Sequence, residues 1–334
     1  MATLLGRRLR TVLFVLTWAA GLLWAVGLLR GVAWSEVASR LSRVPGTAWA
    51  AWVALNVGVL GLPALRWWWI SRTFSPRVAF TRITVYRQAA FAVNYFTPGP
   101  QFGGEPLQVY WLHRGEGLSW SQALSSLALE KAFEVGSNFA FLLAGTGVVW
   151  ASRGHGALTG RSLGWLPVMV GVIGGLVGYG GSLWMGYRPL TRWIRRWAGL
   201  TRWQTAVAQW EEALAQALRE SPVRVLAWTG LSLLTWVGLV WEYAWLWRLL
   251  GAPIGMTDAL LALVLTRLAL LSPFPGGLGA LETAQYVAAR TLGLPPETAA
   301  GVVVALRARD LALGWLGWWV ALPLAQRWAS RTAP

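Results

Sequence analysis

The feature that most constrains this sequence is a series of apolar runs long enough to cross a lipid bilayer. A helix needs about 20 mostly apolar residues to span the hydrocarbon core. Uninterrupted runs of this kind lie at about 11–30, 47–70, 120–150, 163–185, 223–250 and 298–325. The sequence therefore predicts an all-α, polytopic membrane protein with about six full spans and a single membrane domain over 1–334.

Two further apolar stretches, 84–112 and 258–292, are interrupted by proline and glycine near their middle. Proline removes a helical hydrogen bond and clashes with the preceding turn, so neither stretch is expected to form one straight helix. Unpaired backbone at membrane depth is tolerated only inside protein or beside a water-filled cavity. We expect two re-entrant helical hairpins, with two full spans each as the alternative. The break residues are Pro98, Gly99, Gly103 and Gly104, and Pro275, Gly276 and Gly277.

Composition narrows the function classes. Only 13% of the residues are charged, which excludes a water-soluble enzyme, and there is no cysteine for disulfides, thiolate catalysis or Cys-ligated metals. The two histidines, His113 and His155, are too far apart in sequence to suggest a metal site. We therefore expect no metal and no cofactor. The net charge of +16 indicates orientation in the membrane and contact with lipid headgroups, not nucleic-acid binding.

Arginine-rich segments give the expected orientation. They lie at 7–10, 72–82, 188–202 and 327–331, and the positive-inside rule places them in the cytoplasm. Both termini are then cytoplasmic, in the cell (inner) membrane. The first hairpin would enter from the cytoplasm and the second from outside. The segment 189–221 alternates Trp and Arg at its start and is expected to be an amphipathic helix on the cytoplasmic membrane surface.

The chain also repeats itself. A shift of 177 residues aligns Pro98 with Pro275, Gly99 with Gly276 and Glu105 with Glu282. The predicted organisation is an N-terminal span at 11–30, a first repeat at 45–150, a linker span and surface helix at 151–221, and a second repeat at 222–325. Because the charge bias gives the repeats opposite topology, they form an inverted repeat, an architecture typical of transporters. Chance similarity among apolar segments is the alternative.

Charged side chains within the apolar zone are the candidate functional residues, because ionised groups in a membrane are costly and are usually paired. Glu130 and Glu134 share one helix face, as do Arg307 and Asp310. Glu105 and Glu282 lie close to the hairpin tips, where each would either cap a helix or bind a ligand. For Arg66 and Glu242, near span ends, we expect snorkelling towards the membrane surface. The predicted headgroup cleft comprises Arg87, Glu105, Glu130, Lys131, Glu134, Arg267, Glu282, Arg307 and Asp310, with an ion-paired brace as the alternative.

The broken segments resemble a known family. The motifs are Asn94-Tyr95-Phe96-Thr97-Pro98-Gly99 with Gly103-Gly104-Glu105, then Glu130-Lys131 with Glu134, and finally Pro275-Gly276-Gly277-Leu278-Gly279 with Glu282 and Arg307. Together they resemble the lysylphosphatidylglycerol synthase transmembrane region family, also described as flippase-like domain proteins, over roughly 40–325. Where that family has Glu-Arg and a downstream Asp, this chain has Glu130-Lys131 and Glu134. Where a basic residue is common in the family, it has Gln108.

The resemblance implies a membrane domain that moves or binds a lipid. Its two-domain relatives carry a soluble aminoacyl-transfer domain, which we do not expect in this chain. The leading hypothesis is a lipid translocase, not an enzyme, whose cargo is a membrane phospholipid or a polyprenyl-linked lipid. The alternatives are a non-transporting partner of a lipid-modifying enzyme or glycosyltransferase, and an intramembrane enzyme acting on lipid phosphates. No nucleotide-binding P-loop occurs, so movement would follow a gradient or the membrane potential.

Overall fold

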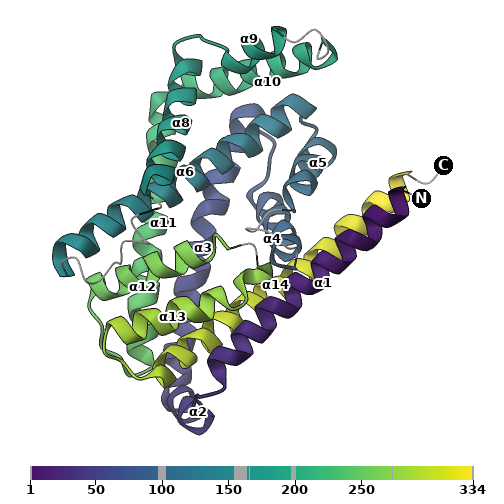
Figure 1. The fold of residues 1–334 in the computed structure, drawn as a ribbon. Coiled ribbons are helices and arrows are strands. Elements are labelled where there is room, and N and C mark those ends of the chain that lie inside the picture. The colour runs from purple at the N-terminus through teal and green to yellow at the C-terminus, as the bar shows by residue number, and fades with distance from the viewer. Residues whose placement is uncertain are drawn as a thin grey trace.

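The computed structural model describes residues 2–96, 103–153, 164, 166–196, 201–272 and 274–332, and over these residues the chain is helical without any strand (Figure 1). The first half contains α1 (Ala2–Leu29), α2 (Trp34–Arg43), α3 (Gly46–Phe74), α4 (Phe80–Phe96), α5 (Glu105–Glu116) and α6 (Trp120–Arg153). The second half contains α8 (Leu166–Trp184), α9 (Pro189–Arg195), α10 (Thr201–Arg219), α11 (Pro222–Leu249), α12 (Met256–Ala269), the 3-10 turn η2 (Pro275–Gly277), α13 (Ala280–Thr291) and α14 (Pro296–Thr332).

Four helices are long and apolar enough to cross a membrane: α3, nearly all of α6, α8 and α11. A fifth crossing is possible if α1 and α2, which are bent by 86° relative to each other, form one span. The multi-pass prediction is thus confirmed, whereas the predicted number of six spans is not. The stretch expected as the sixth span lies within α14, which carries Arg307, Arg309 and Asp310 inside its apolar run.

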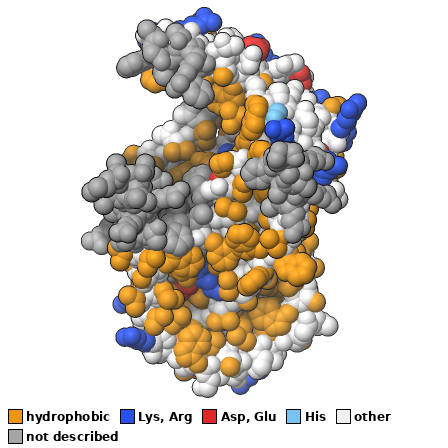
Figure 2. Space-filling view, turned by 90° about the vertical axis from the view of Figure 1, so that its right-hand side faces the viewer, with side chains coloured by type: hydrophobic (Ala, Val, Ile, Leu, Met, Phe, Trp, Pro, Cys, Tyr) orange, Lys and Arg blue, Asp and Glu red, His pale blue; other side chains and the backbone are white. Residues whose placement is uncertain are grey.

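The outer surface fits a lipid environment. Figure 2 shows hydrophobic side chains spread over much of one face. Large apolar side chains stand far out of the fold, among them Leu23, Val57, Val177 and Trp319, each at least 69% exposed. Monomeric soluble proteins rarely expose apolar surface on this scale, so the helices are covered by lipid or by another apolar partner.

Two groups of four helices share the same order and packing. Shifted by 177 residues, α3 would cover 223–251 and α6 would cover 297–330, close to the observed bounds of α11 and α14. In the first group α3 packs against α4 and α6, and α5 packs against the same two helices. The second group repeats these contacts with α11, α12, α13 and α14. Figure 1 shows α3 beginning next to α2 and α11 beginning next to α10, at opposite ends of the molecule.

The two groups meet through close helix contacts: α3 on α11, α4 on α14 and α6 on α12. Small residues allow this approach, as is usual between helices in membranes. A Cβ atom at Gly238 of α11 would lie 2.7 Å from the Val59 side chain of α3. A Cβ atom at Gly317 of α14 would collide with the backbone carbonyl of Gln88 on α4. Gln88 also donates a hydrogen bond of 2.6 Å to the Leu313 carbonyl of α14.

The expected surface helix at 189–221 is two helices, α9 and α10, not one, with residues 197–200 outside the described part. Glu211 of α10 is fully buried and ties the two helices together. Its carboxylate accepts hydrogen bonds from the backbone N–H groups of Leu190 and Thr191, at 3.0 and 2.9 Å, and from the Thr191 hydroxyl. The Tyr179 hydroxyl of α8 donates to the same carboxylate at 2.9 Å. Glu211 therefore sets how α9 sits against α8 and α10.

Replacing Glu211 with Gln is expected to loosen α9, because an amide cannot accept all of these hydrogen bonds. Hydrogen bonds to a charged group contribute roughly 1.5–3 kcal/mol, so the amides of α9 should exchange about tenfold faster or more in hydrogen–deuterium exchange. The matched control is Glu212→Gln, whose side chain is mostly exposed and pairs with Arg188. Equal exchange in parent and Glu211→Gln would contradict the role assigned to this carboxylate.

The same contacts predict a pH dependence. Burial opposes ionisation of Glu211, but the hydrogen bonds from Thr191, Leu190 and Tyr179 outweigh it and hold the pKa of Glu211 below its ordinary value. A carboxyl group with a lowered pKa in the folded state stabilises the fold above its ordinary pKa and loses that contribution as the pH falls through the lowered value. Exchange in α9 should therefore stay slow at neutral pH and rise only in acid below the ordinary glutamate pKa.

Candidate functional site

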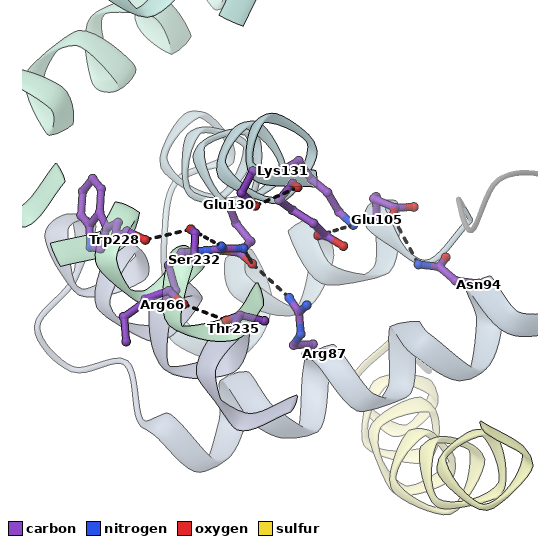
Figure 3. Close-up of polar contacts among 12 residues, drawn as sticks. Arg66, Arg87, Asn94, Glu105, Glu130, Lys131, Trp228, Ser232 and Thr235 are labelled. Carbon is purple, nitrogen blue, oxygen red and sulfur yellow. Dashed lines mark hydrogen bonds and ion pairs between the residues drawn. The ribbon is translucent and has the colours of Figure 1, made fainter. Parts of the chain in front are cut away.

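The most buried charges come from three different helices. Arg66 on α3 and Glu130 on α6 are 3% and 1% exposed, and they form two parallel hydrogen bonds of 2.9 and 2.7 Å. The remaining Nη1 group of Arg66 donates to the Ser232 hydroxyl of α11 at 2.6 Å, and Ser232 donates to the Trp228 carbonyl (Figure 3). Charges are stable in such a position only when they are paired and hydrogen-bonded. This network therefore joins the two helix groups at their centre.

A second set of charges adjoins the first. Arg87 of α4 places its Nη1 atom 3.1 Å from the Glu130 oxygen that Arg66 already binds. Lys131, the next residue of α6, lies 3.2 Å from Glu105 and 3.0 Å from Glu134. Figure 3 shows Arg87 extending from α4 towards α6, and Lys131 reaching Glu105 at the start of α5. All four side chains of the second set are partly exposed.

Glu105 has both roles that the sequence left open. Its Oε2 atom accepts a hydrogen bond of 2.8 Å from the backbone N–H of Gly103, as an N-terminal carboxylate of a helix does. Its Oε1 atom lies near Lys131 and accepts a hydrogen bond of 3.3 Å from the Asn94 amide of α4. The broken stretch is thereby tied to α4 and α6. Pro98 and Gly99, the other break residues predicted here, lie outside the described residues.

The second broken stretch is held by Arg307 of α14. Its Nε and Nη2 atoms donate to the two oxygens of Glu282 at 2.8 and 3.0 Å. The same guanidinium donates to the carbonyls of Gly276 and Gly277 at 2.6 and 3.1 Å. Both glycines have positive φ, of 54° and 62°, which L-residues with a side chain rarely adopt. A further contact of 3.4 Å joins Arg307 to the Tyr95 hydroxyl on α4, so this arginine also links the two helix groups.

A third network was not predicted as a site. Arg309 of α14 pairs with Glu242 of α11 at 2.9 Å and with its neighbour Asp310 at 2.9 Å. It also donates to the Asn56 side chain of α3 at 3.2 Å. Glu242 is 1% exposed. Asp310, predicted in the cleft, is thus near it but bound to Arg309 instead of Arg307.

Arg267 of α12 differs from these cations. Its guanidinium lies over the Trp236 ring of α11 at 4.9 Å, and Trp236 stacks on Phe141 of α6. It takes part in no salt bridge within the described part of the chain, and its buried Nε atom has no hydrogen-bond partner there. Arg267 therefore lies between the helix groups, as predicted, but is stabilised by an aromatic ring.

Snorkelling was the wrong expectation for Arg66 and Glu242. Both side chains point inwards and are almost completely buried, each with an ion-pair partner on another helix. The only available sequence signal was a single charge within an otherwise apolar span, which by itself does not tell inward from outward. Glu130 and Arg307, expected to face each other across the midplane, lie in separate networks.

The networks together are electrically balanced. Six cationic side chains (Arg66, Arg87, Lys131, Arg267, Arg307 and Arg309) accompany six acidic ones (Glu105, Glu130, Glu134, Glu242, Glu282 and Asp310). Among the described residues, no three His, Cys, Asp or Glu side chains come together in a way that fits a metal ion. The arrangement suits electrostatic contact with a polar or charged molecule inside the bilayer.

These observations define a multi-pass, all-helical membrane protein with paired charges between its helices. The chain belongs to the family described as Lysylphosphatidylglycerol synthase TM region, whose family model matches residues 9–317. This confirms the resemblance noted in the broken motifs and indicates a membrane protein of lipid-related function. No curated protein and no solved structure matches the chain.

Proposed function

We propose that this protein is a lipid translocase, not an enzyme. A charged headgroup would pass along the partly exposed charges between the two helix groups while the acyl chains stay in the bilayer. The observation that carries the proposal is the second set of charges, because Arg87, Glu105, Lys131 and Glu134 remain partly accessible within helices that lipid surrounds. Family membership supports a lipid as the cargo, either a phospholipid or a polyprenyl-linked lipid.

The proposal includes an inverted repeat with two re-entrant hairpins. The matching helix order, the shared packing and the opposite directions of α3 and α11 support it. The helices α5, α12 and α13 have 12, 14 and 12 residues, which is shorter than the about 20 residues of a full span. Arginine placement favours cytoplasmic termini and the cell membrane as the location. Such repeats allow a central site to open to either side in turn.

The test is lipid movement in vesicles that contain the purified full chain. Phosphatidylcholine vesicles would carry a trace of fluorescent phosphatidylglycerol, phosphatidylcholine or polyprenyl phosphate, and dithionite would quench only the label in the outer leaflet. We expect the protein to make the inner-leaflet label accessible faster than in protein-free vesicles. No acceleration with any of the three lipids would overturn the proposal.

Arg87→Gln should slow this movement about tenfold, the effect of losing roughly 1.5 kcal/mol from one charge-assisted contact. The matched control is Arg72→Gln, since Arg72 is exposed at the end of α3 and stacks on Trp68. The control should keep the parent rate. Equal rates in all three proteins would remove Arg87 from the pathway. Deleting 189–221 would in turn reveal a partner-recruiting role if partner binding is lost while lipid movement is kept.

A further inference from the structure

The buried cations differ in how completely their donors are used. Arg66 binds Glu130 with two hydrogen bonds and Ser232 with a third, and hardly any of its surface is accessible. Arg307 binds both oxygens of Glu282 and two backbone carbonyls. Neither guanidinium can take a further ligand without breaking several strong bonds at once. These two arginines therefore belong to the framework.

Lys131 and Arg87 are the opposite case. Each is 26% exposed. Arg87 has a single contact with Glu130, a carboxylate that Arg66 already neutralises. Lys131, the only lysine of the chain, contacts two carboxylates without any backbone partner. The charges of Arg87 and Lys131 act on each other and on Glu134, so the three groups share one polar region. This region has cationic donors to spare.

Glu134 is the most weakly held acid of the group. It is 41% exposed, against 18% for Glu105 and 1% for Glu130. Its Oε2 atom lies 3.0 Å from the Lys131 ammonium, but that atom has no aligned hydrogen-bond partner in the described structure. Glu105, by contrast, is also fixed by Gly103 and Asn94. A ligand anion would therefore replace Glu134 before any other carboxylate.

We propose that the anionic phosphate of a lipid headgroup binds between Lys131 and Arg87 by displacing the Glu134 carboxylate. The inference rests on the proposed function and names its substrate class. One negative charge replaces another beside the same cations, so no uncompensated charge is created within the membrane. Lysine binds phosphate as a point charge and arginine offers paired donors, which suits a phosphodiester with two free oxygens.

The two partners of this ion pair should then respond with opposite signs. In native mass spectrometry of the full chain from mixed phosphatidylcholine and phosphatidylglycerol micelles, Lys131→Gln should retain about tenfold less phosphatidylglycerol than the parent. Glu134→Gln should retain more, because the competing carboxylate is gone. Lys131→Arg, which keeps the charge, should stay near the parent, and Arg72→Gln is the matched surface control. A purely structural ion pair would behave differently, with both neutral variants losing thermal stability and neither gaining lipid.

Inorganic phosphate at increasing concentration separates the two sources of the anion. If the site reads a lipid, phosphate should displace little phosphatidylglycerol from the parent. Full displacement by phosphate would overturn the lipid assignment in favour of a free anion. Unchanged or reduced phosphatidylglycerol in Glu134→Gln would overturn the displacement itself, and this variant decides even where Lys131→Gln fails to fold. Vesicle transport in the parent is measured separately, so lipid movement without the sign change leaves the proposed function intact.

Discussion

Arg66→Met is expected to lower the free energy of unfolding by about 3–5 kcal/mol, the usual cost of leaving one partner of a buried ion pair without its counterpart. Glu130 would keep Arg87 as its only cation, at a single contact of 3.1 Å. Ser232 would also lose the donor that now lies 2.6 Å from its hydroxyl. Unfolding in detergent, followed by denaturant titration or thermal melting, measures the loss.

A double variant, Arg66→Met with Glu130→Leu, tests the cause. If the single variant fails because it strands a charge, removing both charges should recover most of the stability. Arg87 is partly exposed and can turn towards water once Glu130 is gone. Additive losses in the double variant would contradict this explanation. So would a loss below about 1 kcal/mol in Arg66→Met, since that is the range of an exposed ion pair.

The sequence predicted the helical layout because local chemistry determines it. Apolar runs of spanning length became α3, α6, α8 and α11, which stay apolar because lipid faces them. The interruption at Pro275-Gly276-Gly277 became a turn that only glycine accommodates readily, with positive φ at both glycines. The shift of 177 residues reappears in the bounds of two helix groups, since matched sequences meet matched helix ends.

The partners of the charges could not be predicted in the same way. Arg66 and Glu130 are 64 residues apart, and Arg309 and Asn56 are 253 apart. Such pairs depend on which helices pack together and how each is rotated, neither of which hydropathy reveals. The two groups also solve the same problem differently. Glu282 pairs with Arg307, but the aligned Glu105 pairs with Lys131, one position beyond the residue that matches Arg307. An alignment alone would have paired Glu105 with Glu130.

Arg307→Ala should be the most damaging change in the second broken stretch, with an expected loss of about 3–5 kcal/mol in the free energy of unfolding. The substitution leaves the Glu282 carboxylate buried without its cation and frees the carbonyls of Gly276 and Gly277. Backbone released at membrane depth has no water to bind. Hydrogen–deuterium exchange should therefore rise in α13 along with the loss of global stability.

Arg307→Lys shows whether the geometry or the charge matters. Lysine keeps the positive charge but offers one compact donor group instead of a planar fork, and it cannot reach a carboxylate and two carbonyls together. We expect it to recover only a small part of the stability, while the control Arg290→Ala, at an exposed position on α13, stays within about 0.5 kcal/mol of the parent. Full recovery by lysine would mean that charge alone holds this stretch. An Arg307→Ala protein that folds with parent stability but has lost lipid movement would instead move Arg307 from the framework into the pathway, and the assignment of the headgroup to Lys131 and Arg87 would have to include it.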